Sequence, residues 1–255
     1  MKEIEIKQLL EKSQYNFDDY KIQIPSYRSD ILHPYDVIED IGIMYGFDKI
    51  KELPLKTFTV GGTSKMNEFI DKIRELIVGM GYQEILSPIL TNKDSLYKNM
   101  NIDDVGTIEI DEFMSENYSV VRSWVVPGLI SILSKNKHVG YPQRIFEEGL
   151  INTRKGVAII ESNSVAIATS HEKVDYTEIR QVLDFIMRCF GLAYDIEDIG
   201  HGSFIEGRVG SVVVKGKHVA YLGEINPEVL NRWGLEIPVA ALELNLTELF
   251  EVVKR

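Results

Sequence analysis

The sequence predicts an α+β protein in which helices flank an antiparallel sheet. One observation is a hairpin signal at 207–225, where two β-rich runs meet at Lys215-Gly216-Lys217. A second is a pair of amphipathic segments, 64–80 and 177–190, whose apolar residues recur at the spacings of three and four that helices show. Hairpins separated by such helices favour antiparallel strands covered by helices, because consecutive antiparallel strands need only short connections.

Composition is that of an ordinary globular protein, with 255 residues, 44% of them hydrophobic and 26% charged. No apolar run is long enough to span a bilayer and no signal-peptide pattern occurs, so we expect a cytoplasmic protein without a membrane partner. The single cysteine, Cys189, excludes an internal disulfide, and its spacing from Val182 predicts a core position. The net charge of −11 is the opposite of the basic footprint of a protein that mainly grips nucleic acid.

The first elements form a small unit. Residues 1–20 predict a helix with a polar turn at 13–16, and residues 21–25 alternate like a short strand that a proline stops. Pro34 suits the first turn of the next helix and Gly46 the residue just past its end. The apolar residues of this helix at helical spacing, expected to form its buried stripe, are Val37, Ile38, Ile41 and Met44.

Acidic residues gather on another face of this helix. Asp36, Glu39 and Asp40 are neighbours on a helix surface, and Asp30 lies just before it. One interpretation is a solvated acidic face that suits the helix dipole and is partly neutralised by Arg28 or His33. The other is an oxygen-ligand site for Mg²⁺. Spacing alone leaves both open.

The domain boundary is predicted where Pro54 and Gly61-Gly62 interrupt the pattern. The predicted organisation is a small domain at 1–55, a linker at 56–63 and a larger domain at 64–255. About fifty residues is near the lower limit for independent folding, so we expect the small domain to be partly frayed or to lean on its neighbour.

The larger domain begins with a helix capped by Ser64. Its strong apolar stripe between Met66 and Met80 fits either core packing or a subunit interface, and the interface interpretation predicts an exposed apolar patch there. Loops around a short strand then occupy 92–116. Further elements are expected in this order: a helix starting at Pro127, a strand from Gln143, β-rich runs at 157–160 and 165–168, the helix at 177–190, the hairpin, a short helix after Asn226 and a strand at 239–246.

The segment 24–48 resembles the β subunit of phenylalanine–tRNA ligase of the archaeal and eukaryotic type. It carries the family pattern P-x-Y-R-x-D-I-x-H from Pro25 to His33, then D-x-x-E-D and Y-G. In that family four acidic residues bind Mg²⁺ near the junction with the α subunit. The matching positions are Asp30, Asp36, Glu39 and Asp40, so the resemblance favours the metal interpretation and implies one Mg²⁺ site at these four residues.

Two further stretches carry the resemblance. Residues 81–90 are similar to motif 1 of class II aminoacyl-tRNA ligases, and R-S-x-x-x-P-G-L from Arg122 together with R-x-F-E-x-G from Arg144 resembles a degenerate motif 2. The implied fold is a class II aminoacyl-tRNA synthetase-like antiparallel sheet flanked by helices, preceded by part of a small α/β metal-site domain. In the family that domain begins further upstream, so the chain is expected to start inside it.

The chemistry of an active ligase is missing from the sequence. The last strand, within 241–249, has neither the glycines nor the arginine of motif 3, and acidic residues stand where an anion site needs positive charge. No G-x-S-x-G, H-E-x-x-H or C-x-x-C pattern occurs either. We therefore expect no catalytic residue and no cofactor-binding residue other than the four metal ligands.

The resemblance implies a non-catalytic subunit. The α subunit would bind ATP, phenylalanine and the acceptor end of tRNA, while this chain would brace that site in an assembly of two α and two β subunits. Contact with tRNA(Phe) would be weak or made through the whole enzyme, and editing of misacylated tRNA is expected to be absent. The basic residues Lys135, Lys137 and His138 fit a helix C-terminus better than a tRNA phosphate contact. Homodimerisation of the isolated chain stays open.

Two alternatives remain. One is a stand-alone Mg²⁺-dependent phosphoryl-transfer enzyme that uses the acidic cluster. Against it, the sequence shows no cluster of lysines and arginines that could bind the phosphates. The other is a synthetase paralogue that acts as a regulatory binding module. Both are separated from the subunit interpretation by co-purification with an α subunit and by ATP turnover of the isolated chain.

Overall fold

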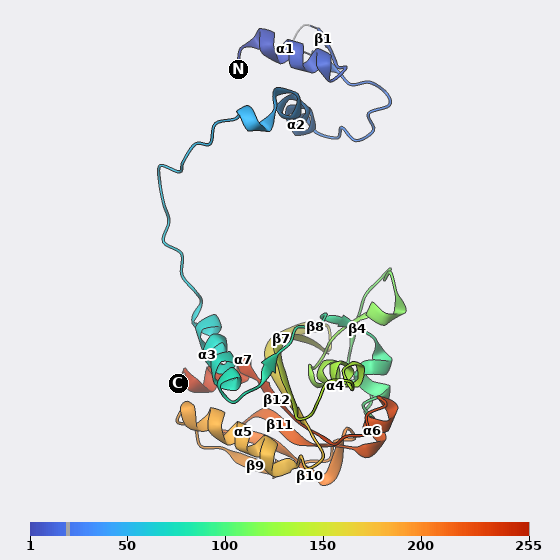
Figure 1. Cartoon of the computed structure of the whole chain (residues 1–255), viewed down its shortest axis with the longest axis vertical. Helices are drawn as coiled ribbons and strands as arrows, with labels where there is room; N and C mark the ends of the chain where they lie inside the picture. Colours follow the sequence, from blue (N-terminus) through green and yellow to red (C-terminus); the bar gives the residue numbers. More distant parts are fainter. Residues whose placement is uncertain (19–20, 255) are drawn as a thin grey trace. The chain divides into compact units, whose positions relative to one another are not determined.

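The computed structural model describes residues 1–18 and 21–254 (Figure 1). The chain divides into two compact units, Met1–Gly61 and Gly62–Arg255. The boundary lies between two glycines of the segment 56–63, where the sequence predicts the linker. Within the described residues, no helix combines the length and apolar character that crossing a bilayer requires.

The small unit consists of two helices that pack against each other and a two-stranded antiparallel ribbon that contacts the first of them. Its core is Leu10, Tyr15 and Val37. The first helix ends at Lys12, where the predicted polar turn begins and Gln14 turns the backbone to a φ of 64°. Residues 16–18 of the stretch predicted as helical form a strand instead, and residues 19–20 lie outside the described residues. The elements are α1 (Glu3–Lys12), β1 (Asn16–Asp18), β2 (Lys21–Gln23), α2 (Pro34–Tyr45) and the short 3₁₀ helix η1 (Phe47–Lys49).

Helix α2 has the bounds that Pro34 and Gly46 predict. The predicted buried stripe is only half right: Val37 is buried and Ile41 partly so, whereas Ile38 is 56% exposed and Met44 43%. The unit is too small to cover the whole stripe, since only α1 and two three-residue strands are available to pack on it.

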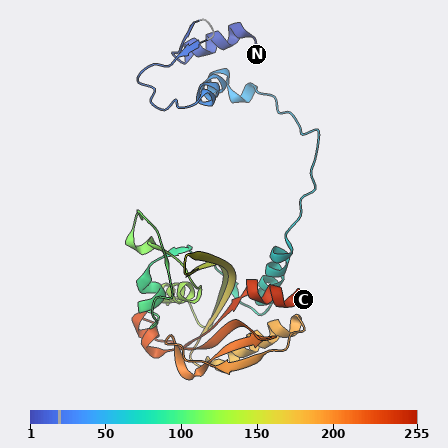
Figure 2. The same cartoon turned by 180° about the vertical axis from the view of Figure 1, so that it is seen from behind.

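The large unit is built on a seven-stranded sheet (Figure 2). The order of its strands is β3-β7-β8-β12-β11-β10-β9. The pattern is antiparallel as predicted, except that the edge pair β3–β7 is parallel. The two predicted β-rich runs, 157–160 and 165–168, belong to one strand except for Val157, which lies in the turn before it. The bounds are β3 (Gln83–Glu84), β7 (Gln143–Lys155), β8 (Ala158–Ser170), β9 (Asp195–Asp198), β10 (Phe204–Val214), β11 (Lys217–Ile225) and β12 (Val239–Asn245).

A second, three-stranded sheet lies in the loop-rich region between the helix at Lys65–Gly79 and the β7–β8 hairpin. It forms where the sequence pattern indicates only a short strand among loops. Its strands are β4 (Leu90–Thr91), β5 (Ile108–Glu109) and β6 (Val120–Val121), accompanied by a single-turn π-helix η2 (Asp94–Lys98) and a 3₁₀ helix η3 (Glu116–Tyr118).

Helices cover both faces of the large sheet (Figures 1 and 2). Alternate residues of β12 belong to two separate cores: Leu242 and Leu244 to one, Val239 and Ala241 to the other. The first core is covered by α3 (Lys65–Gly79), α5 (Tyr176–Cys189) and α7 (Leu246–Val253), and the second by α4 (Val126–Lys135) and α6 (Pro227–Arg232).

Three expectations about this unit are corrected. The apolar stripe of α3 is buried against the chain's own core through Phe69, Ile70, Ile73 and Ile77, so the predicted exposed patch on that stripe is wrong. Cys189 is exposed, because it lies in the last turn of α5. Helix α7 has no counterpart among the predicted elements. The predicted hairpin turn is confirmed, with positive φ at Lys215 and Gly216.

Candidate functional site

The first candidate site is the acidic cluster of the small unit, three of whose four carboxylates lie on helix α2. His33 is the N-cap residue of α2, and Asp36 stands at the third helical position. The Asp36 carboxylate accepts hydrogen bonds from the backbone N–H groups of Leu32 (2.8 Å) and His33 (2.7 Å). Asp36 therefore closes the start of the helix, a role that engages its Oδ2 oxygen.

Arg28 is the cation of this cluster. Its Nη2 lies 2.7 Å from Asp30 Oδ2 and 2.8 Å from Asp40 Oδ2. The buried Tyr15 hydroxyl donates to the same Asp40 oxygen at 2.6 Å. The guanidinium also lies 5.6 Å from the centroid of the Tyr15 ring. Arg28 thus ties the segment before α2 to the middle of the helix.

These contacts shift the pKa values of the cluster. The Tyr15 hydroxyl and Arg28 stabilise ionised Asp40 and lower its pKa, and the Arg28 hydrogen bond lowers the pKa of Asp30. Burial, with the Asp40 hydrogen bond, raises the pKa of Tyr15 to about 12. Asp30 and Asp40 are therefore anions at neutral pH, and the single positive charge of Arg28 offsets one of their two negative charges.

The four predicted ligands do not form a ready metal centre. Asp30 and Asp40 share Arg28, Asp36 is engaged with backbone amides, and Glu39 is exposed on α2. Across residues 1–18 and 21–254, no group of three or more His, Cys, Asp or Glu residues is placed to hold a metal ion. In this arrangement the residues fit an internal ion-pair network, and magnesium binding at these positions stays a prediction.

Acid should loosen the small unit. Because Asp40 has a lower pKa when folded than its ordinary value of 3.8, its contribution to stability is complete above that value. It is lost as the pH falls through the folded pKa. We expect the amide NMR signals of α1 and α2 in the full chain to lose their native positions below about pH 4. An Asp40→Asn variant should lack this share of the pH dependence, and an unchanged acid transition in that variant would contradict the assignment.

The second candidate site is a buried ion pair in the large unit. Arg122 Nη1 lies 2.5 Å from Glu147 Oε1, and neither side chain is more than 6% exposed. The carboxylate also accepts from the Ser87 hydroxyl at 2.7 Å, and Arg122 Nε donates to the carbonyl of Leu150 at 2.9 Å. A side chain at Gly149 would collide with the Arg122 guanidinium, at 2.1 Å from its Nη2.

This pair joins the two motif-2-like stretches of the sequence. R-S-x-x-x-P-G-L supplies Arg122, and R-x-F-E-x-G supplies Glu147 and Gly149. Gly128 of the first stretch lies against Ser87, where a Cβ would come within 3.1 Å of the hydroxyl. The motifs therefore meet in a buried structural contact, in which Arg122 Nε and Nη1 are bound by protein groups.

A third polar group lies on the face of the sheet that α4 covers. Glu243 of β12 is fully buried and accepts hydrogen bonds from the amides of Val125 (2.9 Å) and Val126 (3.0 Å) at the start of α4. The hydroxyls of Ser164 and Tyr221 donate to it at 2.9 and 3.0 Å. Burial raises the pKa of Glu243, while these four donors oppose the increase.

Aromatic side chains close the space beside Glu243. His201 stacks on Tyr221 with ring centroids 5.6 Å apart, and Trp124 and Phe204 pack around them. Burial lowers the pKa of His201, so the ring is neutral at pH 7. His201 thus lies in an aromatic cluster at the entry to β10. Sequence reasoning missed the role of Glu243, although one acidic residue in an otherwise apolar strand was its signal.

Fold and buried charges together define a two-unit α+β protein in which the charged groups of the large unit brace the structure. The comparisons with known proteins make this more specific. Residues 50–246 match the family model "Phenylalanyl tRNA synthetase beta chain CLM domain", and residues 1–47 match "tRNA synthetase B5 domain". The chain belongs to the phenylalanine–tRNA ligase β-subunit family.

Curated relatives agree with this assignment. The chain is 40% identical over 266 residues to the phenylalanine–tRNA ligase β subunit of Thermococcus onnurineus, covering 96% of this chain. It is 41% identical over 258 residues to that of Pyrococcus abyssi, covering 98% of this chain. In both cases the match covers 46% of the relative, so the chain spans about half the length of the curated relatives it matches.

Proposed function

We propose that this chain is a non-catalytic part of the ligase that joins phenylalanine to tRNA(Phe), in which it braces an α subunit that carries the active site. The observation that carries the proposal is the family match over residues 50–246, combined with a sheet whose two faces are covered by the chain's own helices. The large unit would then be a class II synthetase-like domain that has lost its nucleotide site.

The buried charges support the absence of a nucleotide site. Phosphates need fixed positive charge or free amide donors at the site. Arg122, an arginine of the motif-2-like stretches, forms an ion pair with Glu147. The backbone amides of Val125 and Val126 at the start of α4 donate to Glu243. A buried carboxylate on the last strand would repel an anion on that face. We infer that Arg122 and these amides are not available to hold the phosphates of ATP.

The surface around the motif-1-like stretch supports a subunit contact. Although the stripe of α3 is internal, Val78 near its end is 53% exposed, and Leu86, just after β3, is 88% exposed. Ile89 and Leu90 follow with exposures of 41% and 38%. Because β3 is an edge strand of the sheet, these apolar side chains lie where another chain can cover them.

Co-purification tests this function. When the chain is produced together with the α subunit, we expect a stable complex in gel filtration that charges tRNA(Phe) with phenylalanine, whereas neither protein does so alone. A chain that never binds the α subunit would favour a regulatory paralogue. ATP hydrolysis or phosphoryl transfer by the isolated chain would favour an independent enzyme.

Magnesium binding at Asp30, Asp36, Glu39 and Asp40 belongs to this proposal. Since Arg28 occupies two of these carboxylates in the chain alone, we expect Mg²⁺ to leave the isolated chain's α2 amide NMR signals unchanged. In the complex with the α subunit, Mg²⁺ should raise the thermal unfolding temperature. Glu39→Gln should abolish that increase because it removes one of the proposed ligands. It should leave the fold of the small unit intact, because the Glu39 side chain makes no hydrogen bond or ion pair within the described residues. No increase with the wild-type complex would refute the metal site.

A further inference from the structure

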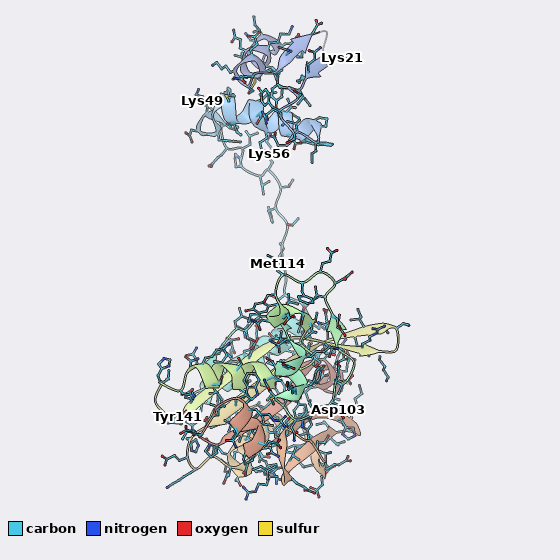
Figure 3. All side chains as sticks on the ribbon, turned by 90° about the vertical axis from the view of Figure 1, so that its right-hand side faces the viewer. Lys21, Lys49, Lys56, Asp103, Met114 and Tyr141 are labelled. Atoms are coloured by element: carbon cyan, nitrogen blue, oxygen red, sulfur yellow. The ribbon has the colours of Figure 1, made fainter. Side chains whose placement is uncertain are left out.

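The tip of the β7–β8 hairpin has an unpaired edge. The two strands pair as far as Lys155 and Ala158, which close a two-residue turn at Gly156-Val157. On its other side β8 pairs with β12 only from Ser164 onward. Residues 158–162 of β8 therefore have no neighbouring strand on that side within the described residues. Figure 3 shows this hairpin, in pale yellow, projecting from the body of the large unit.

The register identifies which backbone groups are open. On β7, the N–H of Asn152 donates to Arg122 O at 3.0 Å and that of Arg154 to Gly106 O at 3.1 Å, so both point away from β8. Two residues directly opposite each other in an antiparallel pair turn their backbone N–H and C=O groups either both toward the partner strand or both away from it. Ile159, opposite Arg154, and Glu161, opposite Asn152, therefore turn their N–H and C=O groups away from β7. In the part of the chain that the structure describes, these groups have no hydrogen-bond partner.

The side chains of this edge are apolar and exposed. Val157 is 98% exposed, Ile159 63% and Ile160 42%, and Glu161 is the only charged residue of β8 beside them. Beside Ile159 lies a shallow hollow of about 300 Å³ lined by Thr107, Ile108, Glu109, Arg154, Val157 and Ile159. An exposed edge of β-branched residues is a template for another strand.

We propose that this edge, at residues 159–161, receives an extended strand of the α subunit, an assignment that rests on the proposed function. Alternating open N–H and C=O groups match the backbone of an extended strand, which binds by adding to the sheet. Cross-strand pairs are most favourable when the added strand of the α subunit has an apolar or β-branched residue opposite Ile159 and a basic residue opposite Glu161.

Size decides between the candidate occupants. Three residues of strand bury far less than the roughly 800 Å² per partner of a stable interface. A free peptide or a second copy joined only at this edge would therefore bind weakly. A subunit large enough to cover exposed apolar residues such as Leu86 as well would add the area of that second contact.

Ile159→Pro is the sharpest test, made in the full chain. Proline removes an N–H that the β7–β8 ladder does not use, and strands tolerate proline at such edge positions. Ile159→Val keeps the amide and the β-branched shape and is the matched control. With purified α subunit as the probe, we expect the proline variant to bind about tenfold more weakly and the valine variant within about twofold of wild type. Equal affinity of all three would overturn the proposal.

The other outcomes are distinguishable. If wild type itself does not bind the α subunit, the proposed function fails together with this inference, whereas normal binding by Ile159→Pro removes the inference alone. A dimer of the isolated chain that Ile159→Pro dissociates, without a change in α affinity, would assign the edge to a second copy and overturn the proposal. Should the proline variant fail to fold, Glu161→Lys tests the same edge. Charge reversal at this exposed position should weaken α binding several-fold, and unchanged binding would contradict the proposal.

Discussion

Replacing Arg122 with methionine is expected to destabilise the large unit by about 3–5 kcal/mol. Methionine retains much of the apolar stem, but Glu147 is completely buried and would lose the one cationic partner that it has among the described residues. The two hydrogen bonds from Ser87 remain, yet they cannot compensate a buried negative charge. The loss is therefore dominated by the unpaired carboxylate, not by the lost contacts of arginine itself.

Urea unfolding followed by tryptophan fluorescence measures this effect, because both tryptophans, Trp124 and Trp233, lie in the large unit. The double variant Arg122→Met with Glu147→Met is the control. Removing both charges should recover most of the stability, since a buried ion pair is often replaceable by apolar groups. A single variant that loses less than about 1 kcal/mol would show that Glu147 does not depend on Arg122.

Replacing Glu243 with leucine is expected to cost about 2–6 kcal/mol, because the amides of Val125 and Val126 each lose a buried acceptor at about 1–3 kcal/mol. Both amides belong to the start of α4, so the helix loses the group that anchors it to the sheet. Leucine suits an apolar strand, and its neighbours Leu242 and Leu244 are fully buried. The cost thus arises from unsatisfied donors and not from side-chain polarity.

Tyr221→Phe provides the matched control for Glu243→Leu. It removes one of the four donors and leaves the carboxylate bound to the two amides and to Ser164. The same fluorescence measurement should give a loss of about 1 kcal/mol for this variant. Equal losses for both variants would contradict the view that Glu243 holds the start of α4.

Local signals in the sequence predict much of the fold. Pro34 and Gly46 determine the ends of α2, Ser64 caps α3, and Lys215-Gly216 forms the turn between β10 and β11. These features depend on a few neighbouring residues. Burial does not, because it depends on what else packs nearby. Ile38 and Met44 are exposed since the small unit offers too little cover, while the stripe of α3 is internal since α7, which the sequence pattern did not indicate, packs against it.

The candidate sites likewise combine features that the local sequence predicts with contacts that depend on the tertiary fold. The resemblance names Asp30, Asp36, Glu39 and Asp40, but spacing could not tell that Arg28 would take two of these carboxylates. The contact between Arg122 and Glu147 joins residues 25 positions apart, and that between Val125 and Glu243 spans 118 positions. Only the tertiary fold shows that these groups pair with one another. The motifs alone therefore suggest a ligand-binding role for residues that the structure uses to hold the fold together.

The central claim is that this chain supports an active site on another subunit and has no nucleotide site in its own sheet. Titration calorimetry of the isolated full chain with ATP and Mg²⁺ tests it most directly. We predict no saturable heat of binding for the chain alone, and ATP-dependent charging of tRNA(Phe) once the α subunit is added. Stoichiometric ATP binding by the chain alone, weakened by substitution of Arg122, would contradict the claim.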